Sequence, residues 1–320
     1  MSGLPVQPRR LLLIGSVLVD ILLYIERLPV RGGDTIARQR LLTSGGGFNI
    51  LAGAARLGMS VSYAGRVGDG PMGVQIMADL TSAGIPLLIP QVRGEDTGFT
   101  VGLIEANAER TFVTAPGTEA HLSLDNLHSI ALQTGDAIYV SGYDLNYPIS
   151  GAALATWLSE LAPGHLLVID PGPLAADIPS ERLARVLARA NILSLNAREA
   201  ALLTGVNDLP EAARLLIPRL APGGCVVARA GAQGCWLASA ILQPCHIPAR
   251  PTHAVDTTGA GDSHVAALLA RLAAGDDLRT AAYAANVAAS LAVEHSGPAT
   301  CPTAQELQEA LARLDKSARA

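Results

Sequence analysis

The sequence predicts an α/β protein whose central sheet is mostly parallel and carries helices on both faces. Short continuous apolar runs, such as residues 11–15 and 166–170, are typical of parallel strands that are buried on both sides. Helical stretches alternate with these runs, which requires right-handed crossovers on either face of the sheet. The length of 320 residues suits one large α/β domain or two smaller ones. We expect a single domain over residues 1–320.

The first third of the chain combines elements of the main sheet with a second, smaller sheet. Main-sheet strands are expected at 11–15 and 61–67, a further strand at 85–92, and helices at 50–57 and 72–83. Three extended runs lie outside this pattern, at 31–40, 97–104 and 111–114, and the last two flank a hairpin signal. We expect these runs to form a β lid from about 21–43 and 97–115 that closes over a ligand.

Beyond residue 136 the alternation becomes regular. Strands are expected at 137–140, 166–170, 192–195 and 225–229, with two antiparallel edge strands at 235–238 and 241–247. Helices are expected at 151–161, 181–190, 197–204, 263–270, 278–294 and 305–314.

Composition excludes several classes of function. The net charge is −5 and no run of Lys or Arg stands out, which argues against nucleic-acid binding. No apolar run is long enough to span a membrane. Arg9 and Arg10 before an apolar run imitate a secretory signal, but Asp20 and the lack of a cleavage site argue against one. The four cysteines form no close pair, so we expect reduced thiols and no zinc site in a cytoplasmic protein without membrane partners.

One glycine-rich turn, residues 256–262 with the sequence Asp-Thr-Thr-Gly-Ala-Gly-Asp, feeds directly into an apolar helix. The N–H groups in the first turn of a helix lack intrahelical partners, and together with the helix dipole they suit a phosphate. Asp262 would repel that phosphate, unless it accepts a proton from the group that attacks it. Taken alone, the motif favours a simpler interpretation, in which Asp262 is a favourable acidic residue in the first turn.

Other polar or glycine-rich turns fall at the expected carboxyl ends of strands, where open α/β sheets bind ligands. Asp20 follows the first strand, although a turn aspartate is equally consistent with its position. Residues 44–49 form a glycine turn that ends at Asn49, whose side chain offers a donor and an acceptor to a ligand hydroxyl. In the alternative interpretation, the glycine turn only allows the helix to pack on the sheet. Asn196 and Glu199 suit a helix capping box, a role that is compatible with ligand binding.

Taken in order, these motifs resemble those of the ribokinase, or PfkB, family of sugar and nucleoside kinases. The signature is residues 256–262, and the supporting motifs are Gly45-Gly46 with Asn49, Gly65-Arg66-Val67-Gly68-Asp69, Asn196 with Glu199, and Gly231 with Gly234. They cover nearly the whole chain. The resemblance implies a three-layer αβα ribokinase-like fold with a small β-sheet lid. It also implies an ATP-dependent kinase that phosphorylates a hydroxymethyl group of a small sugar or sugar derivative.

The resemblance further implies a role for each motif. Asp262 would be the general base, and the backbone of Gly259, Ala260 and Gly261 would form the anion hole. The residues implied in binding the sugar are Asp20, Gly45, Gly46, Asn49 and Arg110. Those implied in binding the nucleotide are Asn196, Arg229, Gly231, Gly234 and Asn286. Glu199 would hold Mg²⁺ through water, while Asp256 and Thr258 would contribute to a K⁺ site.

Three residue choices depart from the common family pattern. Arg229 stands where many members carry Thr, so it either reaches the nucleotide phosphates or is a solvent-facing strand residue. Ser263-His264 replaces the usual Ala-Phe, and His264 is either a second base or, the interpretation we favour, a group that packs behind the site. The glycine turn lacks the lysine found in ribokinase itself, which argues against ribose.

Two alternatives to a sugar kinase remain. One is a nucleoside kinase of the same family, and the other is a non-catalytic regulator that binds a sugar or nucleotide. The presence of Asp262 favours an enzyme over a silent binder. The exposed sheet of the lid is a common dimer surface in this family, so the resemblance implies a homodimer. The sequence does not name the substrate.

Overall fold

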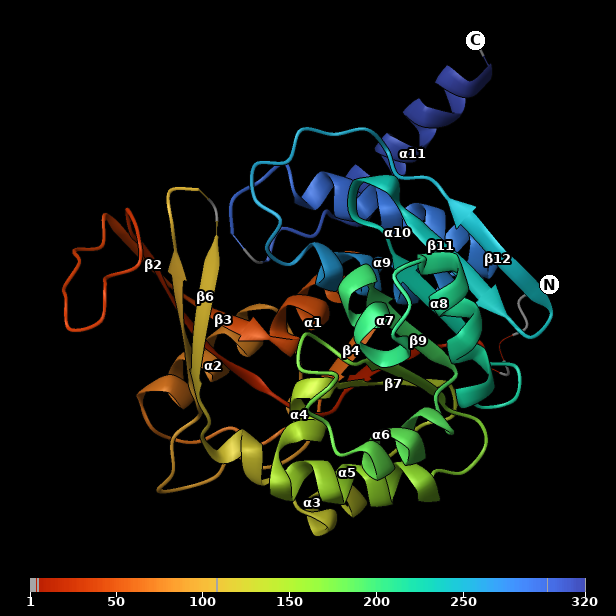
Figure 1. The fold of residues 1–320 in the computed structure, drawn as a ribbon. Helices are drawn as coiled ribbons and strands as arrows, with labels where there is room; N and C mark the ends of the chain where they lie inside the picture. Colours follow the sequence, from red (N-terminus) through yellow and green to blue (C-terminus); the bar gives the residue numbers. More distant parts are fainter. Residues whose placement is uncertain (1–3, 5, 108, 298, 320) are drawn as a thin grey trace.

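The computed structural model describes residue 4 and residues 6–107, 109–297 and 299–319. Within this part of the chain the main sheet has eight strands (Figure 1). All neighbouring strands pair in parallel, except that β11 pairs antiparallel with β10 and β12. The order across the sheet is β12 (Leu242–Ile247), β11 (Cys235–Ser239), β10 (Cys225–Arg229), β9 (Ile192–Asn196), β8 (Leu166–Asp170), β7 (Asp136–Ser141), β1 (Arg10–Leu13) and β4 (Ser60–Tyr63). The expected fold class is confirmed.

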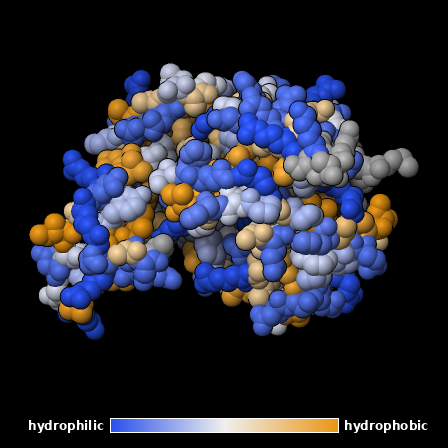
Figure 2. All heavy atoms as spheres, turned by 90° about the horizontal axis from the view of Figure 1, so that it is seen from above, coloured by the Kyte–Doolittle hydropathy of each residue, from blue (hydrophilic) through white to orange (hydrophobic). Residues whose placement is uncertain are grey.

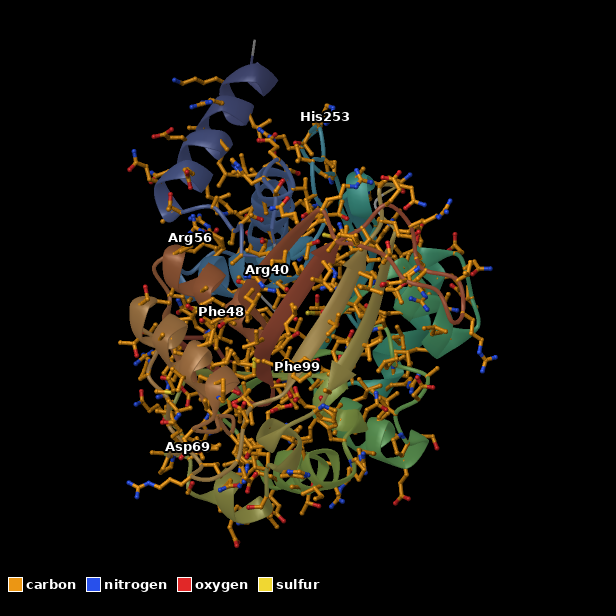
Figure 3. All side chains as sticks on the ribbon, turned by 90° about the vertical axis from the view of Figure 1, so that its left-hand side faces the viewer. Arg40, Phe48, Arg56, Asp69, Phe99 and His253 are labelled. Atoms are coloured by element: carbon orange, nitrogen blue, oxygen red, sulfur yellow. The ribbon has the colours of Figure 1, made fainter. Side chains whose placement is uncertain are left out.

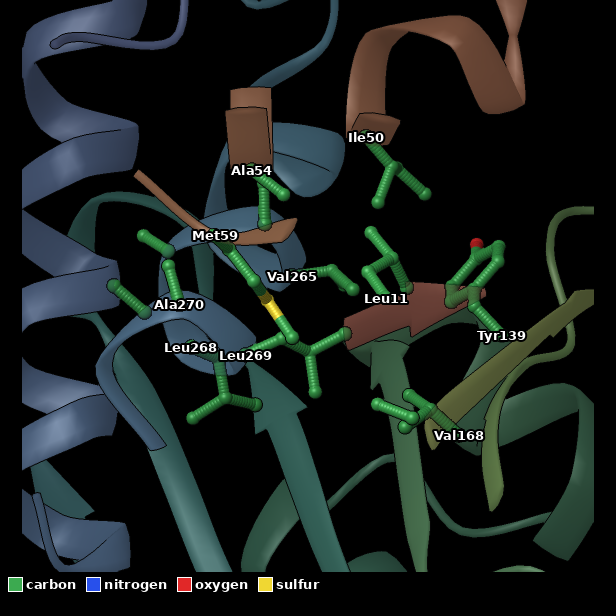
Figure 4. Packing of buried hydrophobic residues seen from close by; sticks show 14 of the residues in the cluster. Leu11, Ile50, Ala54, Met59, Tyr139, Val168, Val265, Leu268, Leu269 and Ala270 are labelled. Carbon is green, nitrogen blue, oxygen red and sulfur yellow. The ribbon is translucent and has the colours of Figure 1, made fainter. Parts of the chain in front are cut away.

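Helices cover both faces because successive residues of a buried strand point to opposite sides. In β1, Leu11 and Leu13 pack on one face, and Leu12 packs on the other. Figure 4 shows the first face, where Leu11 and Val265 are among the packed side chains. This face carries α1 (Gly47–Arg56), α2 (Pro71–Ser82), α9 (Ala260–Ala273), α10 (Leu278–Ala292) and α11 (Ala304–Arg319). The second face carries α3 (Leu124–His128), α4 (Gly142–Asn146), α5 (Pro148–Glu160), α6 (Ser180–Leu187), α7 (Ala197–Thr204) and α8 (Leu209–Leu216).

A second sheet of four strands stands at one side of the main body (Figures 1 and 3). Its order is β3 (Gln39–Gly46), β2 (Val17–Tyr24), β5 (Phe99–Ile104) and β6 (Arg110–Ala115). The small sheet was expected, and β5 and β6 form the expected hairpin. The expected extended run at 31–40 is wrong for most of its length, because residues 25–38 are irregular and the strand begins at Gln39.

The sequence interpretation missed β2, which has a consequence for Asp20. The apolar run that starts at Leu11 continues to residue 23, and it contains two strands that belong to different sheets. The chain changes sheets at Gly15, whose φ of 137° is unfavourable for other residues. Asp20 therefore lies in the middle of β2, paired across the small sheet, rather than in a turn after a main-sheet strand.

The expected strand at 85–92 is also wrong. This segment makes only isolated parallel bridges, from Leu87 to Tyr63 and from Val92 to Gly68. Short 3₁₀ turns occur at Thr118–His121, Ile217–Arg219 and Gly231–Gln233. No helix among the described residues combines the length and the apolar character needed to cross a membrane.

Candidate active site

A cavity of about 340 Å³ lies where the small sheet meets the carboxyl ends of the main strands. Seen from above, the part that holds the small sheet stands away from the body, with a notch between them (Figure 2). The small sheet contributes Asp20, and α4 contributes Asp144. Asp170 and Arg229 come from the ends of β8 and β10, and Asp262 from the start of α9. Five elements that are distant in the sequence therefore meet at one cavity.

Asp262 occupies the first turn of α9, as the sequence predicts. The helix begins at Ala260 after Gly259, whose φ of 73° favours glycine. Asn49 Nδ2 donates a hydrogen bond to Asp262 Oδ2 at 3.0 Å, which fixes the carboxylate. Burial nevertheless raises the pKa of Asp262 from 3.8 to about 6, because desolvation outweighs the Asn49 hydrogen bond. A carboxylate with this pKa is a better proton acceptor than an ordinary aspartate, and it is still ionised at neutral pH.

The backbone at the start of α9 is suited to an anion. The N–H of Ala260 makes only a long hydrogen bond of 3.3 Å, to the carbonyl of Thr257. Among the described residues, no acceptor pairs with the N–H groups of Gly261 and Asp262. Gly261 also lies close to the guanidinium of Arg229, since a Cβ on Gly261 would stand 3.5 Å from Arg229 Cζ. Two free N–H groups and a cationic side chain thus converge on one side of the cavity.

Asp20 lies on the face of the small sheet that lines the cavity, in a row with Thr43, Thr100 and Thr114. Burial, and then the charge of Asp262, raise the pKa of Asp20 from 3.8 to about 7. Gly45 on the neighbouring strand leaves room for this carboxylate, because a Cβ there would come within 2.0 Å of Asp20 Oδ2. The Asp20 carboxylate can therefore hold this position only because residue 45 has no side chain.

Arg229 points into the cavity and is not a solvent-facing strand residue. Its Nη1 donates to Asp170 Oδ2 and to Ser194 Oγ, both at 2.9 Å. Its Nη2 lies 3.6 Å from Glu199 Oε2. Burial alone would lower the pKa of Arg229, but the two carboxylates outweigh it and raise that pKa. The cavity therefore holds a permanently charged guanidinium.

Asn196 and Glu199 form the expected capping box at the start of α7. Asn196 Oδ1 accepts from the N–H of Glu199 at 3.0 Å, and Glu199 Oε2 accepts from the N–H of Asn196 at 2.7 Å. Glu199 is buried and lines the cavity. Burial and the charge of Asp170 raise its pKa.

Arg110 does not line the cavity. It lies at the start of β6, and its Nη2 donates to Asp256 Oδ1 at 2.7 Å. The same oxygen accepts from the N–H and the hydroxyl of Thr258, and Asp256 Oδ2 accepts from the N–H of Gly297. In this structure Arg110 therefore occupies Asp256 Oδ1, at the position where the resemblance implied a K⁺ site. The small sheet is tied to the loop that precedes α9.

Two further predicted groups lie outside the cavity. Asn286 is buried behind it, where its Nδ2 donates to the backbone carbonyls of Ile247 and Pro248. Gly231 and Gly234 shape the turn after β10, and a Cβ on Gly234 would clash with the carbonyl of Ile247.

His264 is also behind the site, as we favoured. Its Nε2 lies 3.1 Å from Asn286 Oδ1, which places the ring proton on Nε2 because Asn286 Nδ2 is itself a donor. Burial and the charge of Arg229 lower its pKa to about 3, so the ring is neutral.

Sequence reasoning missed several lining residues, above all Asp170 and Asp144. Asp170 carried a usable signal, because it ends a buried strand at the edge where ligands bind. Asp144 follows β7 in the same way, in the first turn of a helix whose N-cap is Ser141, so that serine was the signal available for it. Phe112 and Tyr143 also line the cavity.

Comparisons with known proteins agree with this geometry. Residues 8–305 match the pfkB family of carbohydrate kinases, and the chain belongs to that family. It is 34% identical over 302 residues to an uncharacterized sugar kinase, YegV, of Escherichia coli K12, with 92% of each chain covered. It is 32% identical over 249 residues to a fructokinase of Klebsiella pneumoniae, covering 73% of this chain and 79% of the relative.

The fold is similar to that of a ribokinase from Arabidopsis thaliana, solved in complex with ribose and ATP. The TM-score is 0.76 at 22% identity, and the similarity covers 95% of this chain and 99% of the other.

Gly45→Ala tests the fit between Gly45 and Asp20. The new methyl group would displace the Asp20 carboxylate, so we expect affinity for the acceptor to fall about tenfold or more while affinity for ATP is unchanged. Titration of each ligand by calorimetry measures both. Thr111→Ala, on the exposed strand β6, is the matched control. Equal loss of both affinities would contradict the assignment.

His264→Phe tests whether His264 has a structural role behind the site. The change leaves Asn286 Oδ1 without a donor, so we expect a loss of about 1–3 kcal/mol in the free energy of unfolding. Because the pKa of His264 is about 3 in the fold and 6.5 when unfolded, wild-type stability falls as pH drops below 6.5. The variant should lose less stability between pH 6.5 and pH 5, as measured by urea unfolding. A change in the pH dependence of catalysis would instead favour a second base.

Proposed function

We propose that this protein is an ATP-dependent kinase that phosphorylates a hydroxymethyl group of a small sugar or sugar derivative. The observation that carries the proposal is the position of Asp262. A carboxylate whose pKa is raised to about 6 faces the cavity directly beside two unpaired N–H groups of a helix start. A base next to an anion site suits the transfer of a phosphoryl group to a hydroxyl.

The acceptor is proposed to bind between the small sheet and Asp262. Asp20, Thr100 and Thr114 offer acceptors and hydroxyls to a polyol from one side. Asn49 borders this site through its hydrogen bond to Asp262, and it is proposed to reach an acceptor hydroxyl with its buried Oδ1, which has no partner among the described residues. Gly45 and Gly46 complete this side by letting the chain approach closely. Arg110 contributes indirectly, by holding the start of β6 to Asp256.

The triphosphate is proposed to extend from the start of α9 across Arg229 towards the turn at Gly231 and Gly234. Arg229 would balance the charge of the transferred phosphoryl group. Asn196 would lie beside the phosphates. Asn286 would act indirectly, because its side chain holds the backbone carbonyl of Ile247 at the end of β12. Mg²⁺ would be held near Glu199 and Asp170, whose carboxylate oxygens suit it, and would neutralise charge on the phosphates.

In the proposed mechanism, Asp262 accepts the proton of the acceptor hydroxyl as that oxygen attacks the γ-phosphorus. Asn49 keeps the carboxylate oriented towards the cavity. The N–H groups of Gly259, Ala260 and Gly261 are proposed to hold the oxygens that gain charge in the transition state, with Ala260 first releasing its long bond to Thr257. The small sheet covers the acceptor and excludes water that would otherwise receive the phosphoryl group.

A nucleoside is the second candidate for the acceptor. Phe112 and Tyr143 line the cavity, and both expose part of their rings, so they could stack on a base. A catalytically silent regulator is disfavoured, because Asp262 and its anion site are both intact.

The homodimer and the cytoplasmic location are also proposals. On the face of the small sheet away from the cavity, Leu42, Ile21, Val101 and Val113 form an apolar row across four strands. Leu42 and Val113 are exposed, and a second copy of the chain would cover them.

Asp262→Asn is the decisive test of the base. The amide keeps the shape of the side chain but cannot accept the proton, so we expect kcat to fall by about 10²–10⁴-fold with ATP affinity nearly intact. ADP release over a panel of pentoses, hexoses and nucleosides identifies the acceptor, and the best acceptor is then used with the variant. Asp177→Asn, an exposed carboxylate elsewhere, is the matched control. Normal turnover by Asp262→Asn would sink the mechanism.

The pH dependence of kcat/KM provides an independent test. Asp262 accepts a proton only when ionised, so activity should rise with pH through about 6 rather than through the ordinary value of 3.8. Asp20 and Asp144, each with a pKa of about 7, titrate in the same range, so Asp20→Asn should simplify the acidic limb while the contribution of Asp262 near pH 6 stays in place. If kcat/KM of the wild type rose with pH through about 4 instead, the raised pKa of Asp262 would be contradicted.

A further inference from the structure

The charges around the cavity are distributed unevenly. Five acidic side chains line it, and Arg229 is the one basic side chain among the described lining residues. Arg229 is paired with Asp170 and lies 3.6 Å from Glu199, so its charge is directed to the proposed nucleotide end. The acceptor end is left with three carboxylates, those of Asp20, Asp144 and Asp262.

Asp144 is the member of this group that the proposed mechanism does not use. It lies on α4, just beyond the end of β7, and its side chain is almost wholly buried. Ser16 Oγ donates to Asp144 Oδ1 at 2.5 Å. The second oxygen is packed against the backbone of Gly15, because a Cβ there would come within 2.0 Å of Asp144 Oδ2. Asp144 therefore forms part of the cavity wall with its carboxylate held between Ser16 and Gly15.

We propose that Asp144, together with Asp20, makes the acceptor site selective for uncharged polyols, and that sugar phosphates and sugar acids are rejected. This inference rests on the proposed kinase function. Carboxylates accept hydrogen bonds from hydroxyl groups, so an uncharged polyol satisfies them. A phosphate or carboxylate on the acceptor would instead lie among like charges wherever these carboxylates are ionised, and the described lining residues offer no free guanidinium or ammonium group to balance it.

The position of Asp144 makes it the residue most suited to this selection. Asp262 faces the reacting hydroxyl, and Asp20 approaches from the small sheet, so both contact the acceptor in any productive position. Asp144 comes from the body of the molecule, on the wall that also includes Ser16 and Tyr147. A substituent remote from the reacting hydroxyl would meet this wall, and its charge decides whether binding is favourable.

The test compares acceptors that differ only in charge. Ribose with ribose 1-phosphate, and glucose with gluconate, are assayed by ADP release with the wild-type enzyme. We expect kcat/KM to favour the uncharged partner of any pair that is turned over by about a hundredfold or more. In Asp144→Asn the preference should shrink by about tenfold, because one repelling charge is removed while the shape is kept. The wild-type comparison does not depend on the variant folding.

The controls separate selection from a structural role. Asp177→Asn, an exposed carboxylate outside the cavity lining, should leave the preference unchanged. An unchanged preference in a folded Asp144→Asn protein would overturn the role of this residue. Efficient phosphorylation of ribose 1-phosphate or gluconate by the wild type would overturn the selectivity and leave the kinase function standing. If no acceptor of a wide panel supported ATP turnover, the kinase function would be overturned, and this inference with it.

Discussion

The site depends on one electrostatic constraint, which is that, among the described lining residues, five carboxylates share a small cavity with a single guanidinium. Burial raises the pKa of Asp20 and of Asp144 to about 7 and that of Asp262 to about 6. Arg229 offsets this cost mainly through Asp170 and Glu199, and to a smaller extent at Asp262. Under the proposed function, the end that holds this guanidinium would take the polyphosphate, and the end with Asp20 and Asp144 would take the hydroxyl groups of the acceptor.

Much of the main body could be predicted from sequence, because buried parallel strands and their crossover helices leave strong apolar periods. The start of α9 was predicted in detail for a similar reason. A glycine before an apolar helix has few structural alternatives, and Gly259 takes the positive φ that the turn requires. The capping box of Asn196 and Glu199 is equally local, so it too was legible in the residue order.

The small sheet was predicted less well, because its strands are recognised by their partners rather than by their own pattern. The run from Leu11 to residue 23 shows no break in hydrophobicity where the chain passes from one sheet to the other at Gly15. Arg229 could not be assigned either, since its direction depends on Asp170, 59 positions away in the chain. Asp144 escaped notice because nothing local distinguishes it from a surface aspartate. Contacts between distant segments set these positions, and a single sequence does not display them.

The ion pair between Arg110 and Asp256 joins the two moving parts of the proposed reaction. Arg110 lies at the start of β6, beside the turn of the hairpin, and Asp256 lies in the loop between β12 and α9 that leads to the proposed anion site. A sheet that swings open to admit an acceptor must break this pair, and it thereby releases Asp256 from one of its donors to Oδ1. Under the proposed function, access to the cavity and the bracing of the loop before α9 would therefore be coupled through this one ion pair.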